Sequence, residues 1–302
     1  MKKRTKTALI ASLILIFAGA AVAFAGLVSI NFDFKEMSTQ KLYNKSCDIH
    51  EEFEEISIEC DCDVEFIATD SANVRVEYSQ FEDRPITARV QNGILEITEN
   101  DARKWYEMII SVNFESPKIK IYLPKKDYRE LVADTGVGDI KLDGGLCFES
   151  VELTASTGDI SFIVDVNEKL QIETDTGDIT EKNSDALKME LHTDTGRIAL
   201  TDSQIQTFSA ESDTGDIHLD AVMISKTLEI KSDTGDVDIS ACDALELKIE
   251  TQTGDVTGEL LSEKIFITET DTGRISVPSS ASGGVCSIKT DTGDISIKIK
   301  DK

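Results

Sequence analysis

The triplet Asp-Thr-Gly recurs through the C-terminal half of this 302-residue chain, for example at residues 175–177. In aspartic proteases this triplet supplies the catalytic carboxylate, and two such loops lie face to face and share one proton. Those enzymes have Ser or Ala after the triplet, whereas this chain has Asp or Arg. Nine similar corners cannot each form half of a catalytic pair. The sequence therefore predicts that Asp175 belongs to a bend, and we assign no catalytic residue.

The glycine at the third of four positions indicates the kind of bend. In Asp-Thr-Gly-Asp a type II turn would place this glycine at positive φ, which glycine adopts without steric cost. The first Asp would accept backbone N–H groups across the bend as an Asx turn. The structural corner glycines predicted in this way are Gly158, Gly177, Gly196, Gly215, Gly235, Gly254, Gly273 and Gly293.

Acidic residues at these corners would form two columns if the repeats stack. The first column would contain Asp175, Asp194, Asp213, Asp233, Asp271 and Asp291. The second would contain Asp139, Asp159, Asp178, Asp216, Asp236, Asp255 and Asp294. In sequence order Arg197 interrupts the second column after Asp178, and Arg274 interrupts it between Asp255 and Asp294.

Stacked carboxylates offer the hard oxygen ligands that calcium prefers. The calcium candidates are Asp175, Asp178, Asp213, Asp216, Asp233 and Asp236. The chain lacks the G-G-x-G-x-D calcium repeat, and so the sequence favours solvated corners with neither a metal ion nor a cofactor.

The corners must be positioned by a regular repeat. The aligned glycines from Gly138 to Gly293 are 19 or 20 residues apart, and a fixed short period indicates a solenoid. Ile or Val always follows two places after the glycine, and Leu, Met, Phe, Val or Cys lies seven places before it. The sequence predicts an all-β fold: a single-stranded parallel β-helix of about nine 19–20-residue coils over residues 131–302. Glu181 and Gly258 break an apolar column, and we expect local bulges there.

The N-terminus indicates export. Residues 1–30 combine a basic start with an uncharged run over residues 8–30, which is long enough to span a bilayer as a helix. The sequence favours a single-pass anchor in the cell membrane, with a cytoplasmic N-terminus and everything after about residue 30 extracytoplasmic. Secretion after cleavage near Ala25 is the alternative, because Ala23-Phe24-Ala25 fits a signal-peptidase site.

Two further segments connect the anchor to the repeat. Residues 31–50 are polar and without period, and we expect a stalk. Residues 51–130 are rich in strand patterns that are out of phase with the repeat, and we expect them to cap the solenoid. At the far end Lys298, Lys300 and Lys302 would lie on an exposed last strand, where lysines discourage edge-to-edge association.

Composition narrows the range of partners. The formal net charge of −26 argues against nucleic acid, whose phosphates require basic patches. The six cysteines lack the spacing of a disulfide framework or a zinc site, and Cys60 and Cys62 would share one face of a strand as small apolar residues.

With these residues in view, the chain resembles the putative-adhesin family of bacterial β-strand-repeat proteins, a domain of unassigned function. The resemblance rests on Cys62-Asp63-Val64, on the segment "IKIYLPKKDYREL" and on the Thr-Gly-Asp-Ile corners, and it covers roughly residues 51–302. It implies an exported, often membrane-anchored protein, in some cases linked to cell-envelope stress. Relatives often have Gly where this chain has Cys62, so the first coil should differ locally.

The function expected from this reasoning is a non-enzymatic, membrane-anchored extracytoplasmic solenoid. It would be adhesin-like or an envelope-associated scaffold, with a protein or polysaccharide of the envelope as partner and the lipid bilayer contacted through residues 8–30. A carbohydrate-active β-helix enzyme acting on envelope or environmental polysaccharide is the alternative.

Overall fold

The computed structural model describes residues 3–29, 31–33, 38–104, 113 and 115–300. Its helix, α1 (Lys3–Ser29), includes the stretch Ser12–Ser29, which has a mean hydropathy of 2.3 and is long and apolar enough to cross a membrane. None of that stretch is buried against the rest of the protein. A membrane anchor and a signal sequence both have these properties.

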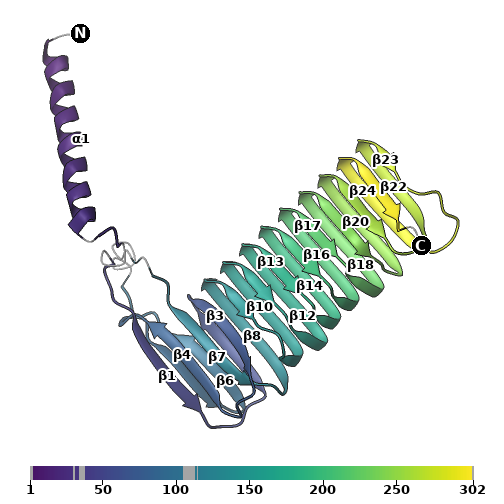
Figure 1. Cartoon of the computed structure of the whole chain (residues 1–302), viewed down its shortest axis with the longest axis horizontal. Helices are drawn as coiled ribbons and strands as arrows, with labels where there is room; N and C mark the ends of the chain where they lie inside the picture. Colours follow the sequence, from purple (N-terminus) through teal and green to yellow (C-terminus); the bar gives the residue numbers. More distant parts are fainter. Residues whose placement is uncertain (1–2, 30, 34–37, 105–112, 114, 301–302) are drawn as a thin grey trace.

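All the other regular elements are strands (Figure 1). The N-terminal strands are β1 (Tyr43–Ile49), β2 (Glu55–Cys60), β3 (Asp63–Thr69), β4 (Val74–Gln80), β5 (Ile86–Gln91), β6 (Ile94–Glu99) and β7 (Lys118–Pro124). The long strands of the repeat are β8 (Asp127–Val137), β10 (Cys147–Thr157), β12 (Asp165–Thr176), β14 (Asp185–Thr195), β16 (Gln204–Thr214), β18 (Met223–Thr234), β20 (Glu246–Thr253), β22 (Lys264–Thr272) and β24 (Gly284–Thr292). The short strands are β9 (Ile140–Leu142), β11 (Ile160–Phe162), β13 (Ile179–Lys182), β15 (Ile198–Thr201), β17 (Ile217–Asp220), β19 (Val237–Cys242), β21 (Val256–Leu260), β23 (Ile275–Ser276) and β25 (Ile295–Ile299).

A long strand and the short strand after it form one coil, and each coil is named here by its two strands. The coils stack into two sheets that run the length of the rod (Figure 1). Sheet A has the order β1-β4-β7-β3-β9-β11-β13-β15-β17-β19-β21-β25-β23, and sheet B has the order β22-β24-β20-β18-β16-β14-β12-β10-β8-β2-β6-β5. Equivalent strands of the repeat pair in parallel, as in Leu170↔Met189 and Ile179↔Ile198. The predicted all-β parallel solenoid is confirmed.

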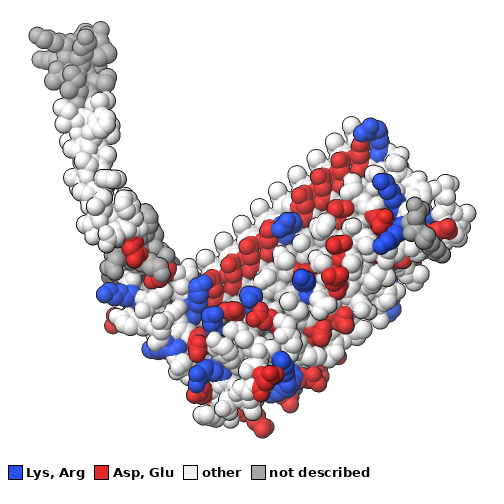
Figure 2. Space-filling model, in the orientation of Figure 1, with Lys and Arg blue, Asp and Glu red and all other residues white. Residues whose placement is uncertain are grey.

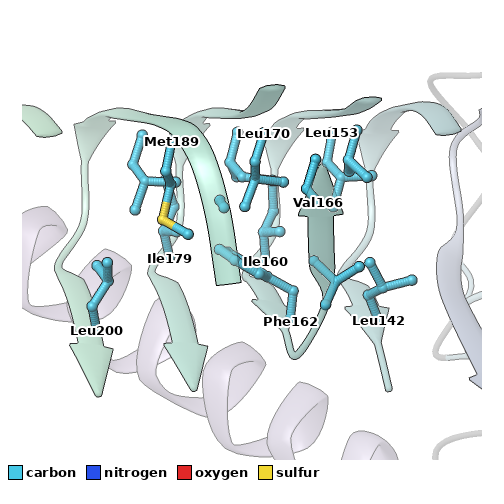
Figure 3. Close-up of a cluster of buried hydrophobic side chains, with 14 of the residues drawn as sticks. Leu142, Leu153, Ile160, Phe162, Val166, Leu170, Ile179, Met189 and Leu200 are labelled. Carbon is cyan, nitrogen blue, oxygen red and sulfur yellow. The ribbon is translucent and has the colours of Figure 1, made fainter. Parts of the chain in front are cut away.

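The core lies between the two sheets as continuous apolar columns. Leu170 and Met189 of sheet B face Ile160 and Ile179 of sheet A, and all four side chains are fully buried (Figure 3). Alternate side chains of a strand point to the same side, so each coil carries one apolar stripe. A single coil cannot bury that stripe alone, and stacking removes it from water.

Strands β2 and β3 form a coil that is in phase with the repeat, which the sequence pattern did not predict. β2 pairs with β8 through Cys60↔Thr135. A Cβ on Gly138 would overlap the backbone carbonyl of Cys62, so Cys62 takes the place that a corner glycine has in the later coils. Two residue steps therefore separate Cys60 from Cys62, whereas three separate Thr135 from Gly138. The first corner is one residue shorter than the later ones, and alignment on the glycine period missed it for that reason.

The N-terminal edges of both sheets consist of antiparallel strands. β1 pairs antiparallel with β4 at the edge of sheet A, and β5 pairs antiparallel with β6 at the edge of sheet B. β1 therefore lies inside residues 31–50, for which the sequence predicted a polar stalk. Most of its side chains are exposed, since β1 is the terminal strand of sheet A among the described residues, and its polar composition fits that position.

The last two coils are stacked in the reverse of their order along the chain. Coil β24–β25 lies between coil β20–β21 and coil β22–β23, and Cys286 pairs with Leu247 on one side and Phe266 on the other. Lys298 and Lys300 are exposed as expected, although β25 is not the outermost strand: it pairs with β21 along its length and with β23 up to Ser296. Lys302 lies outside the described residues.

Three local features suit coil β22–β23 to the outer position. Thr268 takes an inward place where the inserted coil has Ile288, so less apolar surface lies at the open end. β23 ends just before Val277-Pro278, and proline, which lacks an N–H donor, is tolerated at sheet edges. Gly283 and Gly284 allow β24 to enter, because a Cβ on either would overlap a backbone carbonyl of an adjacent coil.

The two predicted bulges have different outcomes. The pairing of β19 with β21 shifts register next to Gly258, which confirms an irregularity there. Glu181 pairs in regular register with Phe162 and Leu200, so the bulge predicted for it is wrong. Its carboxylate is accommodated inside the core by the hydroxyl of Ser203, at 2.6 and 2.7 Å from its two oxygens.

Candidate functional site

The repeated corner presents the densest array of polar side chains on the rod. Its glycines other than Gly273 have φ from 150° at Gly215 to 158° at Gly177 and Gly196. A type II turn requires about +80°, so the type II prediction is wrong, and the glycines adopt an extended conformation at positive φ that other residues rarely take. A Cβ would also overlap the carbonyl oxygen of a neighbouring corner glycine at Gly158, Gly177, Gly196, Gly215, Gly235, Gly254, Gly273 and Gly293.

A buried hydroxyl satisfies the carbonyl group at most of these corners. Thr174 Oγ1 donates to the oxygen of Gly158 at 3.1 Å, and Thr193 Oγ1 donates to that of Gly177 at 3.1 Å. Both threonines are fully buried, and a buried carbonyl without a partner would be costly. The Thr or Ser found three places before the glycine thus has a structural cause.

The second column of aspartates forms a ladder of hydrogen bonds from coil to coil. Asp159 N–H donates to Asp139 Oδ1 at 2.9 Å, and Asp178 N–H donates to Asp159 Oδ1 at 2.8 Å. The pattern continues from Asp236 to Asp216, Asp255 to Asp236 and Asp294 to Asp255. The predicted Asx role of the first column is therefore wrong: in most coils the N–H of the residue after the corner glycine goes to a second-column carboxylate, and the N–H groups on either side go to backbone carbonyls of the adjacent coil, as at Gly177 and Ile179.

Magnitudes explain why a row of like charges is tolerated. Carboxylates about 5 Å apart repel by about 0.8 kcal/mol in a water-like dielectric. A hydrogen bond to a charged group contributes roughly 1.5–3 kcal/mol. Each second-column aspartate that accepts a backbone N–H therefore gains more than its exposed neighbours cost.

The order of charges along this row differs from the order expected from the sequence. Asp294 follows Asp255 directly, because the last two coils are interchanged, and Arg274 lies beyond Asp294 with an ion pair of 2.8 Å. Lys118 begins the row through a 2.9 Å ion pair with Asp63. The acidic row is visible along one edge of the rod with cations at its ends and at its middle (Figure 2).

The corners offer no preformed metal cage. Among the described residues, no group of three or more His, Cys, Asp or Glu side chains is placed to hold a metal ion. Asp178, Asp216 and Asp236 each already accept a backbone N–H through Oδ1. Asp175, Asp213 and Asp233 are exposed on the first column. The preference for solvated corners over calcium binding stays a prediction.

A second candidate site lies where the final coils interchange. A cavity of about 770 Å³ opens there, within the range of small-ligand sites. Lys264 lies in its wall with 3% of its surface exposed, and its Nζ donates to Asp243 Oδ1 and to Ser262 Oγ, each at 2.5 Å. The sequence analysis missed this site because it depends on the coil order. The structure pairs Lys264 with Gly284, and the sequence alone offered only a lysine at the start of a repeat strand.

The hydrogen bonds of this cluster connect two turns of the rod. Ser262, Lys264 and Asp243 lie within hydrogen-bond reach of one another, as a serine–lysine nucleophilic pair would require. An ammonium that donates to both neighbours has no lone pair with which to accept the serine proton. The lysine therefore fixes the turn before β22 to the turn before β20.

Solved structures with the same architecture exist at low sequence identity. A putative lipid binding protein from Parabacteroides distasonis ATCC 8503 is 16% identical with a TM-score of 0.56, over 86% of this chain and 98% of that one. A putative adhesin from the same strain is 14% identical with a TM-score of 0.53, over 86% and 98% of the two chains. A putative adhesin from Parabacteroides merdae ATCC 43184 is 13% identical with a TM-score of 0.51, over 87% and 98%. At these identities the likeness concerns the fold alone.

Sequence-based comparison gives a family as well as a fold. No curated protein matches the chain significantly. The family model described as Toastrack DUF4097 matches residues 53–298, which span the described strands from β2 to most of β25. This range agrees with the region over which the corner motifs indicated the putative-adhesin family. The chain belongs to the Toastrack DUF4097 family.

Proposed function

We propose that this protein is a non-enzymatic, membrane-anchored solenoid that binds a component of the bacterial envelope. In this proposal α1 spans the cytoplasmic membrane with the N-terminus inside, and the strands lie on the extracytoplasmic side. The partner is an envelope protein or polysaccharide, and expression linked to envelope stress fits the family resemblance. The structural neighbours are called two putative adhesins and one putative lipid binding protein, and these names all refer to binding.

One observation carries the proposal: the residue types that could do chemistry are used to build the rod. Second-column aspartates accept backbone N–H groups, and the corner threonines donate to glycine carbonyls. Binding requires only an accessible surface, which the outside of the rod provides. The apolar helix, which is not buried against the rest of the protein, would hold that surface at the membrane. Cleaving a polysaccharide would need carboxylates free to act as acid and base in a cleft.

The orientation can be tested by protease accessibility. Intact bacterial cells that express the full chain, stripped of any outer barrier, are treated with a protease and probed for each terminus. We expect loss of the C-terminal epitope and retention of an N-terminal epitope. Protection of the C-terminus would contradict the extracytoplasmic placement, and release of the mature chain into the medium would favour cleavage near Ala25.

The binding role can be tested by cross-linked capture with the full chain in its native envelope. We expect one reproducible envelope protein or polysaccharide to be captured. Candidate polysaccharides are then incubated with the purified chain, and new reducing ends are measured. Turnover that disappears on mutating one coil would establish the enzyme alternative and overturn the proposal.

A further inference from the structure

The interchange of the last coils leaves part of one strand without an outer neighbour. β25 pairs with β21 along residues 295–299, whereas β23 covers only Ile295 and Ser296. β23 ends at Ser276, where Val277 still packs partly buried against the core but Pro278 has no N–H with which to continue the strand pairing. Among the described residues, Ile297 to Ile299 therefore have a partner strand on one side only.

The backbone of this stretch can accept another strand. The N–H of Lys300 donates to Leu260 on the β21 side at 2.9 Å, and the N–H of Ile295 donates to Arg274 on the opposite side at 2.8 Å. Successive residues of a parallel strand direct their backbone N–H and C=O groups alternately to the two neighbouring strands, so those of Ile299 point to the same side as those of Ile295. Its N–H and C=O are aimed at the position that β23 leaves empty. An unpaired edge of this kind is a template for strand addition.

The edge continues into the cavity at the coil interchange. Ile299 and Lys300 lie in the cavity wall, together with Asp243, Ser262 and Lys264. An extended segment placed along β25 would thus run from the empty position in sheet A into a space of about 770 Å³.

Charge and alternation define the segment that fits. Ile297 is buried with 2% of its surface exposed, and Lys298 and Lys300 are exposed. A segment that pairs with this edge would place apolar side chains beside Ile297 and Ile299 and acidic ones beside Lys298. Opposite charges across paired strands are favourable, and like charges are not. A cationic segment is disfavoured, and so is the same edge of a second copy.

We propose that the outer edge of β25 from Ile297 to Ile299, with the adjoining cavity, binds an extended acidic peptide by strand addition. This inference rests on the proposed binding function and specifies its partner as a protein segment rather than a polysaccharide. Glu259 lies beside Lys298 on β21, and Glu263 lies in the cavity wall. Both would repel acidic side chains of the peptide that are not placed next to Lys298 or Lys300.

The test is fluorescence anisotropy with the full chain in detergent micelles. The probe is a labelled hexapeptide of alternating valine and glutamate. Comparison peptides replace glutamate by lysine, or carry N-methyl groups on alternate backbone amides. We expect saturable binding of the acidic peptide and at least tenfold weaker binding of both comparison peptides. Equal binding of the lysine peptide, or no effect of N-methylation, would refute strand addition at this edge.

Matched charge reversals locate the site. The double variant Lys298→Glu and Lys300→Glu should lose at least tenfold in affinity. For a control of equal charge, the single variant Lys298→Glu is compared with Lys289→Glu. Both single variants make the same charge change on the same coil, but Lys289 is exposed on β24 in the other sheet, so only Lys298→Glu should weaken binding. Unchanged circular dichroism and melting temperature identify folded variants. Equal losses in both single variants would mean that a nonspecific charge effect explains the binding.

A polysaccharide probe separates this inference from the proposed function. If polygalacturonate binds in a manner that Lys298→Glu and Lys300→Glu abolish, and the acidic peptide does not bind, the edge is a saccharide site and the peptide inference is wrong. If no probe binds here while envelope capture still succeeds, the inference fails and the proposed function stands.

Discussion

Glu181 places an ionisable carboxyl group inside an otherwise apolar column of the solenoid. Only 1% of the residue is exposed, and its partners in the column are Phe162 and Leu200. Burial raises the pKa of Glu181 from 4.5 to about 7, although hydrogen bonds from Ser203 and Ser184 act in the opposite direction. The perturbation that tests this is Glu181→Gln, which keeps the shape and removes the charge.

The magnitude follows from proton linkage. A pKa raised from 4.5 to about 7 changes the free energy of unfolding by about 3 kcal/mol between low and high pH, at about 1.4 kcal/mol per pKa unit. Because the folded-state pKa is raised, the folded state binds this proton more tightly than the unfolded state does. The stabilising contribution is therefore complete below pH 4.5 and is lost as the pH rises through 7. We expect Glu181→Gln to equal the natural protein near pH 4.5 and to be more stable by up to about 3 kcal/mol at pH 8.5.

The assay is urea denaturation of the full chain in micelles, followed by circular dichroism at pH 4.5, 7 and 8.5. The difference between the two proteins isolates Glu181, because other titrating groups, such as the buried Glu99 whose pKa is also raised, are common to both. Glu173→Gln serves as control, since Glu173 is exposed on the neighbouring strand β12. A stability difference that does not change between pH 4.5 and 8.5 would refute the reasoning.

Other predictions concern the corners and turns. Gly215→Val should destabilise the protein by several kcal/mol, because valine is strained at this φ and its side chain would overlap Gly196. Asp216→Asn should cost less than about 2 kcal/mol, because it only weakens one hydrogen bond from Asp236. Equal losses of stability in chemical denaturation would contradict this description of the corner. Ala221→Gly should stabilise by roughly 0.5–1 kcal/mol, because Ala221 has φ of 56°, and an unchanged urea midpoint would contradict it. Arg197→Asp should lower the melting temperature by adding a carboxylate to the row, and calcium should restore it no more than sodium at equal ionic strength; a saturable calcium-selective rescue would establish a metal site.

The periodic part of the fold was predictable because each column has a single physical cause. The Ile or Val two places after the corner glycine is buried between the sheets in every coil except the outermost one, where Ile275 is exposed, and a Cβ on any corner glycine would overlap a backbone carbonyl of the adjacent coil. Both constraints repeat at the period of the stack. A pattern repeated at a fixed spacing therefore indicates which residues lie inside before any coordinate is known.

Features that depend on a single event were not predictable from that pattern. The order of the last two coils depends on Pro278, Gly283 and Gly284, each of which occurs once. The family resemblance placed a first coil at Cys62, but the glycine period did not show it because its corner, Cys60 to Cys62, is one residue shorter and has no glycine. The terminal cavity and the charge order of the acidic row both follow from the coil order. The sequence indicated that aspartates lie at the corners, but only the structure shows that second-column carboxylates accept hydrogen bonds from the next coil.

The interchanged coils have a consequence for how the chain can be assembled as it is made. A solenoid in sequence order can add each coil to the one before it while the rest of the chain is still emerging from the ribosome or translocon. Here coil β22–β23 emerges before coil β24–β25 but must lie outside it. A growing chain must either hold a place open beside β20 and β21 or release a coil that has already docked. The tip is therefore completed only when the last strand has been delivered, and a chain truncated by its final coil would end in a different surface.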